Sequence, residues 1–140
     1  IERNPSLFNN IIQDGHAIGN HTYSHERGTT TKIGAYIDSI CKTEALYCSK
    51  LFRPPYGRMS FSQVGKLVSM GKKIIMWTWN AQDYKTSLEY SEIINTAEGI
   101  KGRDILLFHN SQKSEQNMKK SLPEVIRIIK QKQLLFKLLD

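Results

Sequence analysis

The chain has 140 residues, of which 39% are hydrophobic and 24% charged, a balance typical of one globular domain with its own core. No apolar run approaches the ~20 residues of a membrane span. The net charge is +7, but the lysines are scattered without interleaved aromatic residues, which argues against a nucleic-acid groove and favours a solvated surface.

Short apolar strands alternate with amphipathic helices. Asn4 and Pro5 predict the start of a first helix, and Gly15 predicts its end. Strands are predicted over residues 17–21, 51–53, 73–79, 105–109 and 134–139. Further helices are predicted over 32–46 and over 122–132, and two more are predicted to begin after caps at Ser60 and Ser91. This alternation predicts a parallel sheet or barrel, in one domain over residues 1–140.

Two details of the helix over 32–46 can be compared with a structure. Its apolar spacing predicts that it turns one face inward, made of Ile33, Ile37, Ile40 and Ala45. The two cysteines, Cys41 and Cys48, are interpreted as ordinary thiols that are buried or partly buried.

Reactive residue types follow the predicted strands at their C-terminal ends, where parallel β/α folds build their active sites. His21 and His25 lie four apart in the segment HTYSH. Two such imidazoles can converge on one ion and suit Zn²⁺, with Co²⁺, Ni²⁺ or Fe²⁺ also compatible. Surface or structural histidine pairs share this spacing, but the strand-end position favours a metal site. His16 precedes the strand and is interpreted as a turn residue.

The segment RPPYG, Arg53 to Gly57, predicts a rigid loop after the second strand. Its two prolines fix the backbone, and Gly57 permits an unusual turn. Such a loop can aim the backbone N–H of Tyr56 at a developing oxyanion, and Arg53 can hold a carboxylate with two hydrogen bonds. Taken alone, the segment is explained better as a stiff structural turn.

Two further candidates follow the later strands. Asp83 lies in the segment WNAQDY, where a carboxylate can support a catalytic group, and an ordinary turn is the structural alternative. His109 ends the apolar strand of the segment LLFHN, where a histidine can act as general acid or base near neutral pH. A hydrogen-bonded core histidine is the alternative there. Trp77 and Trp79 are expected to belong half to the core and half to a pocket.

In this order and spacing, the segments GHAIGNHTYSH, LFRPPYG, WNAQDY and ILLFHN resemble the second to fifth motifs of the polysaccharide deacetylase family. This family is also called the NodB-homology domain or carbohydrate esterase family 4, and the resemblance covers nearly the whole chain. It implies an α/β fold, a distorted and incomplete (β/α) barrel. It also implies removal of N-acetyl, sometimes O-acetyl, groups from polymers such as peptidoglycan, chitin or xylan.

The resemblance assigns roles to the first two motifs in the chain. His21 and His25 would be ligands of a divalent metal, with zinc as the expected ion and Co, Ni or Fe as alternatives. Tyr56 would supply the N–H group for the oxyanion, and Arg53 would orient the catalytic base.

The last two motifs receive the remaining roles. His109 would protonate the leaving amine, and Asp83 would steady Arg53 or tune His109. Leu107 would line the pocket for the acetyl methyl group. Tyr84, which stands where the family usually has tryptophan, and Trp79 would contact the glycan.

The first family motif is an Asp-Asp pair that supplies the catalytic base and the third metal ligand, and it has no counterpart in this sequence. We therefore expect the domain over residues 1–140 to be truncated at its N-terminus. We also expect this chain alone to bind metal weakly and to be inactive or nearly so, because two imidazoles are fewer than the three protein ligands of a typical catalytic zinc site.

A non-catalytic relative that binds glycan through Tyr56, Trp79 and Tyr84 is the alternative to an enzyme. A different histidine-metal hydrolase on a β/α scaffold is disfavoured by RPPYG in series with His109. The expected partner is an acetylated polysaccharide or oligosaccharide, with no nucleic acid and no membrane span in this chain. The family implies an extracellular, periplasmic or cell-surface location.

Overall fold

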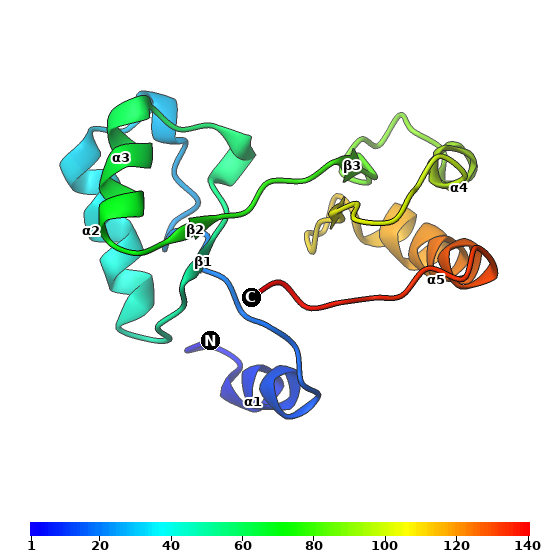
Figure 1. Ribbon diagram of the computed structural model, residues 1–140, viewed down its shortest axis with the longest axis horizontal. Helices are drawn as coiled ribbons and strands as arrows, with labels where there is room; N and C mark the ends of the chain where they lie inside the picture. The colour runs from blue at the N-terminus through cyan, green and yellow to red at the C-terminus, as the bar shows by residue number, and fades with distance from the viewer. The chain divides into compact units, whose positions relative to one another are not determined.

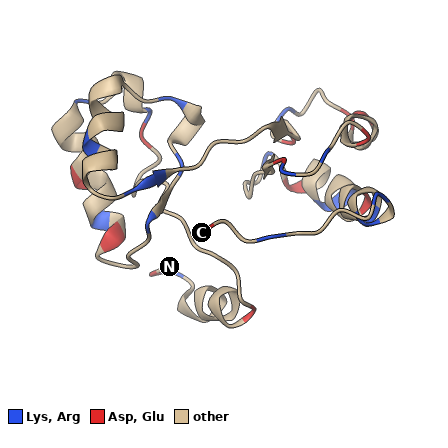
Figure 2. Ribbon diagram, in the orientation of Figure 1, with Lys and Arg blue, Asp and Glu red and all other residues tan.

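The computed structural model describes residues 1–140, which divide into two compact units. The first unit comprises Ile1–Met76 together with Leu138–Asp140, and the second comprises Trp77–Lys137. In each unit, helices accompany a pair of short parallel strands (Figure 1). No helix combines the length and the apolar character needed to cross a membrane. Lysine and arginine are scattered over helices, loops and one strand, and occur in both units, as predicted (Figure 2).

The first unit is built on two paired strands and three helices. Strands β1 (Leu51–Phe52) and β2 (Lys73–Ile74) are parallel, with Phe52 opposite Ile74. A single parallel bridge joins Asn20 to Phe52, so the predicted strand over 17–21 is reduced to one paired residue. The helices of this unit are α1 (Pro5–Gln13), α2 (Ile33–Glu44) and α3 (Phe61–Ser69), with short 3₁₀ turns at Gly28–Thr30 and Pro55–Gly57.

The helix starts of this unit follow the predicted rules in part. α1 begins at Pro5 as predicted, and Gly15 adopts the left-handed conformation (φ 79°) beyond its end. In α3, the Ser60 hydroxyl accepts from the Gln63 N–H, and the Gln63 side chain accepts in return from the Ser60 N–H, which forms the predicted cap.

Four fully buried side chains form the core of the first unit, namely Tyr36, Ile40, Phe52 and Leu67. They come from α2, β1 and α3, and α2 and α3 lie side by side in Figure 1. The predicted inward face of α2 is therefore correct at Ile40 and wrong at Ile33 and Ala45, which are exposed. The aromatic ring of Tyr36, which meets Phe52 edge to face, takes the inward position instead.

The core of the first unit contains one polar group without a partner, the hydroxyl of Tyr36. Burial, together with the charge of Glu26, raises the pKa of Tyr36 from 10.0 to about 12. Replacing Tyr36 with phenylalanine is expected to stabilise the protein by about 1 kcal/mol, because an unpaired buried hydroxyl costs free energy that its removal recovers.

The same substitution is expected to change the pH dependence of stability. Between pH 10 and 12 the folded state keeps the phenol proton that the unfolded state loses, so stability falls as pH rises above about 10. Urea unfolding at pH 7 and pH 11 measures both effects. The advantage of the Tyr36→Phe variant should be larger at pH 11, and an equal or smaller advantage there would contradict the burial of an un-ionised phenol.

The second unit has strands β3 (Trp79–Asn80) and β4 (Leu106–Leu107), which pair in parallel with Trp79 opposite Leu106. Its helices are α4 (Tyr90–Ala97) and α5 (Glu115–Gln131), which lie side by side in Figure 1. The core is a cluster of aliphatic side chains from these helices and the turn after α4, namely Ala97, Ile100, Val125, Ile128 and Ile129.

Several predicted elements differ in extent. The expected strand over 73–79 is two separate strands, β2 and β3, which belong to different units. The final helix begins at Glu115 rather than residue 122, and it tolerates Pro123 because its burial of Val125 and Ile129 outweighs one lost hydrogen bond. No strand forms over 134–139, where no neighbouring strand offers a partner for the backbone.

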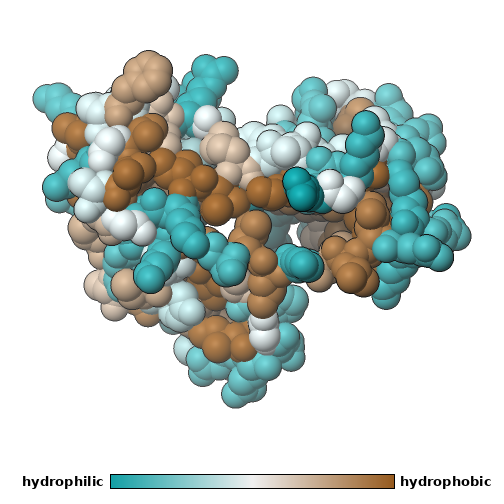
Figure 3. Space-filling view, in the orientation of Figure 1, coloured by the Kyte–Doolittle hydropathy of each residue, from teal (hydrophilic) through white to brown (hydrophobic).

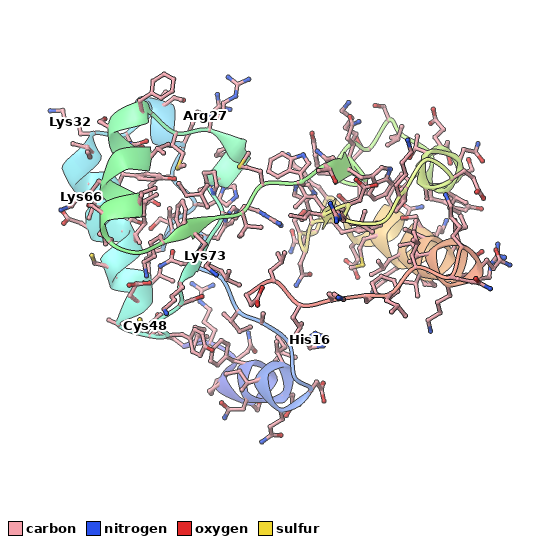
Figure 4. The ribbon with its side chains drawn as sticks, viewed as in Figure 1. His16, Arg27, Lys32, Cys48, Lys66 and Lys73 are labelled. Carbon is pink, nitrogen blue, oxygen red and sulfur yellow. The ribbon has the colours of Figure 1, made fainter.

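Two side-chain predictions are corrected. The residue before α4 is Glu89 rather than Ser91, and its N–H donates to the Glu92 carboxylate. Cys41 and Cys48 are both exposed free thiols rather than buried ones, and Cys48 lies beyond the C-terminal end of α2 (Figure 4). On the face drawn in Figure 3, hydrophobic residues are interspersed with hydrophilic ones.

Candidate active site

The two histidines of HTYSH form a contacting pair in the first unit. Their rings meet edge to face with centroids 4.9 Å apart. His21 Nδ1 lies 2.6 Å from the backbone oxygen of Arg53, and since a carbonyl only accepts, Nδ1 carries the hydrogen. The lone pair of the neutral imidazole is then on Nε2, which is the atom that would face a metal. A carbonyl that orients a histidine in this way is typical of metal sites.

The loop that carries this pair has an unusual backbone. Thr22 and His25 both adopt the left-handed conformation, with φ of 63° and 60°. Non-glycine residues rarely do so unless their surroundings hold them there, and such residues cluster at functional sites. His16 lies in the turn beyond α1, as predicted (Figure 4).

Buried Asn20 holds the start of this loop. Its side-chain Oδ1 accepts from the Thr22 N–H at 2.9 Å, and its Nδ2 donates to the Ile40 carbonyl at 3.0 Å. The loop is thereby tied to the core-facing side of α2. Asn20 is not among the predicted site residues, and the pair Gly19-Asn20 directly before His21 is the sequence signal that could have marked it.

Ser39 and Glu26 hold the other end of the loop. The Ser39 hydroxyl accepts from the Tyr23 N–H at 2.9 Å and donates to the Glu26 carboxylate at 2.7 Å. Burial would raise the pKa of Glu26, but the hydrogen bonds from Ser39 and Thr22 outweigh it and the pKa lies below its ordinary value. Neither residue could be predicted from the sequence, because nothing in the local pattern places Ser39 beside Glu26, 13 residues away.

Arg53 is anchored by the backbone that follows β2. Its Nε donates to the Ile75 carbonyl at 3.1 Å, and its Nη2 lies 3.4 Å from the Met76 oxygen. Burial lowers the pKa of Arg53 from its ordinary value. The guanidinium is therefore held in a fixed orientation, with nitrogen atoms that still have donor capacity for a carboxylate.

Tyr56 lies beside the histidine pair. It adopts the left-handed conformation (φ 59°) inside the turn Pro55–Gly57, and its ring contacts that of His25 with centroids 4.8 Å apart. The guanidinium of Arg27 covers the same ring at 4.8 Å. Within the turn, the Gly57 N–H donates to the Pro54 carbonyl and the Arg58 N–H donates to the Pro55 carbonyl. The Tyr56 N–H donates to no carbonyl of this turn.

The second unit contains a hydrogen-bonded aspartate–histidine pair. His109 Nδ1 lies 2.7 Å from Asp83 Oδ1, and the His109 backbone N–H donates to Asp83 Oδ2 at 2.9 Å. Asp83 is fully buried, whereas the His109 side chain keeps 34% of its surface exposed. This contact is compatible with the predicted role in which Asp83 tunes His109. The Nδ1 hydrogen bond leaves Nε2 as the atom for proton exchange.

The three residues expected to contact the glycan lie in the second unit with different exposure. Tyr84 is exposed and meets the His109 ring with centroids 4.8 Å apart. Trp79 packs against Phe108 beside the aliphatic cluster, and Leu107 is buried. Leu107 belongs to β4, two residues before His109, so the two side chains lie on the same segment.

The donor set fits a divalent metal only in part. The chain offers two contacting imidazoles, one oriented by a carbonyl, which is the chemistry that zinc prefers. No group of three or more His, Cys, Asp or Glu side chains able to hold an ion occurs among residues 1–140.

A family model described as polysaccharide deacetylase matches residues 1–75. The chain is 33% identical over 90 residues to a peptidoglycan-N-acetylglucosamine deacetylase of Bacillus cereus, a match that covers 60% of this chain and 33% of that protein. It is 29% identical over 136 residues to chitin deacetylase 1 of Saccharomyces cerevisiae, covering 87% of this chain and 45% of the relative. The chain therefore spans less than half of the length of either relative.

A solved structure shows the same fold. The structure of the Bc1960 peptidoglycan N-acetylglucosamine deacetylase superposes with a TM-score of 0.88 at 29% identity, covering 99% of this chain and 68% of that chain. This similarity confirms the predicted fold class, an α/β fold of the incomplete barrel type found in carbohydrate esterase family 4.

Proposed function

The chain belongs to the polysaccharide deacetylase family. From that premise we propose that it is part of a hydrolase that removes N-acetyl, or O-acetyl, groups from a polysaccharide such as peptidoglycan or chitin. The observation that carries the proposal is the family match over residues 1–75, which includes both HTYSH and RPPYG. Residues 1–140 would form one domain of this type. Its polymer substrate would place the protein outside the cell or at its surface.

His21 and His25 would hold a divalent ion, with zinc as the first candidate and Co, Ni or Fe as alternatives. The contacting rings and the carbonyl that orients His21 support this assignment. A bound divalent ion supplies Lewis-acid polarisation of the acetyl carbonyl and lowers the pKa of water.

The chain's own residues would then act on the acetyl group. The Tyr56 N–H would donate to the carbonyl oxygen as negative charge develops on it. Arg53 would orient the carboxylate that takes the proton from water, which in the family comes from the Asp-Asp motif that has no counterpart in this sequence. His109, held by Asp83, would donate a proton to the leaving nitrogen. Tyr84 and Trp79 would contact the sugar, and Leu107 the acetyl methyl group.

We expect these 140 residues alone to bind metal weakly and to release acetate slowly or not at all. Two imidazoles provide fewer bonds than the three protein ligands typical of catalytic zinc, and no carboxylate completes the set. If so, a titration of the chain with Zn²⁺ or Co²⁺ will show weak binding that His21→Ala or His25→Ala reduces by at least about tenfold. The matched control is His16→Ala, at an exposed histidine that should leave the affinity unchanged.

The hydrolase proposal is tested by acetate release from peptidoglycan, chitin oligosaccharides and acetylated xylan, with the chain and with a longer form that carries the Asp-Asp motif of the family. A longer form that carries the family's Asp-Asp motif should release acetate in the presence of metal, and His109→Ala in that form should reduce the rate by about 100-fold or more. Robust turnover by the chain would contradict the two-ligand argument. Glycan binding through the exposed Tyr56 and Tyr84 without turnover by either sample would favour the non-catalytic relative.

A further inference from the structure

The Asp83–His109 pair is supported by two residues at the N-terminal end of α5. Ser114, the residue before α5, is fully buried. Its hydroxyl donates to the His109 carbonyl oxygen at 2.7 Å and to the Ser111 carbonyl oxygen at 2.9 Å. The same hydroxyl oxygen accepts from the Ser111 N–H at 3.0 Å. A serine in this position normally caps the helix with its side chain, but the Ser114 hydroxyl makes no such bond. The hydroxyl bonds instead to the backbone of the loop that carries His109.

Asn117, one turn further along α5, supports the loop that carries Asp83. Its Nδ2 lies 2.9 Å from the Leu88 carbonyl, 3.2 Å from that of Lys85 and 3.4 Å from that of Asp83. One amide group thus binds three carbonyls of this loop, those of Asp83, Lys85 and Leu88, to the helix. Asparagine inside a helix is unfavourable by propensity, so these hydrogen bonds offset a local cost.

α5 is a suitable base for both loops because it is anchored elsewhere. Its Val125, Ile128 and Ile129 side chains are buried in the aliphatic cluster of the second unit. Ser114 and Asn117 lie three residues apart, which places them on the same face of consecutive turns. One holds the backbone of His109 and the other the loop of Asp83, so the distance between the two catalytic candidates is set through one helix.

We propose that Ser114 and Asn117 are positioning residues that preset the Asp83–His109 hydrogen bond. Neither reaches the reacting atoms. Ser114 acts through the backbone of His109, and Asn117 acts through the loop of Asp83, which in turn holds His109. The catalytic value of this arrangement rests on the proposed function, but the arrangement itself is testable in the chain without any activity. A failure here and a failure of the deacetylase proposal are therefore distinguishable.

The test is NMR of the chain labelled with ¹⁵N at histidine, which reports the tautomer of His109 and the exchange of its Nδ1 proton with water. In the wild type we expect a single Nδ1–H tautomer with a slowly exchanging proton. Asn117→Ala should add the other tautomer and speed exchange of the Nδ1 proton by about tenfold, because the Asp83 loop loosens. The matched control is Asn95→Ala, at an exposed asparagine of α4.

A second variant keeps the result decisive. Ser114→Ala should speed exchange of the Nδ1 proton to a similar degree, with Ser91→Ala in α4 as its exposed control. If Asn117→Ala does not fold, the near-isosteric Asn117→Asp removes the same donors with less loss of packing. Unchanged tautomer and exchange in folded variants would overturn the proposal. So would unfolding of every variant, which would make the two residues general stability determinants.

Discussion

Replacing Phe52 with alanine is expected to lower the free energy of unfolding of the first unit by about 3–5 kcal/mol. Phe52 is fully buried, meets the ring of Tyr36 at a centroid distance of 6.2 Å and contributes to the core with Leu67. Removing the ring deletes apolar contact area and leaves a cavity that the neighbours fill only partly. Arg53 follows directly, so the RPPYG loop should loosen with the strand.

The matched control is Phe61→Ala, the same change at a phenylalanine that is 97% exposed, which should alter stability by no more than about 0.5 kcal/mol. Both tryptophans, Trp77 and Trp79, lie in the second unit, so their fluorescence does not report on the first. Hydrogen exchange measured by mass spectrometry in urea separates the two units. Equal effects at Phe52 and Phe61 would contradict the core described above.

Replacing Lys72 with methionine is expected to destabilise the first unit by about 3 kcal/mol. The Lys72 ammonium pairs with the Glu44 carboxylate at the end of α2 and donates to the Ser49 carbonyl at 2.7 Å. The two side chains are 6% and 20% exposed, so the variant leaves a carboxylate without its partner in a poorly hydrated place. Methionine keeps the aliphatic stem, so the loss measures charge and hydrogen bonding rather than packing.

An exposed ion pair on α5 provides the comparison for Lys72. Lys119 and Glu115 are 68% and 57% exposed, and Lys119→Met should cost at most about 0.5 kcal/mol. Raising the salt concentration should shrink this small effect and leave the effect at Lys72 largely intact, because buried pairs are screened less. A loss at Lys72 no larger than that at Lys119 would show that Glu44 is solvated after the substitution.

The helices could be predicted from the sequence more reliably than the strands. Proline after asparagine marked the start of α1, and the Ser60 cap marked that of α3, because these signals depend on neighbours at most three or four residues away. The strands depend on partners far along the chain. The apolar run over 73–79 therefore reads as one strand, whereas pairing with β1 and with β4 divides it into two.

The sequence by itself determined the family, the fold class and the identity of the candidate residues, because each motif is a short segment that ends a strand. Only the tertiary structure decided their surroundings. It oriented His21 on the Arg53 carbonyl, joined Asp83 to His109, and brought Ser39, Ser114 and Asn117 to the loops that carry them. Except for the contact of Ser114 with His109, these contacts join residues that are distant in sequence, so no spacing along the chain could reveal them.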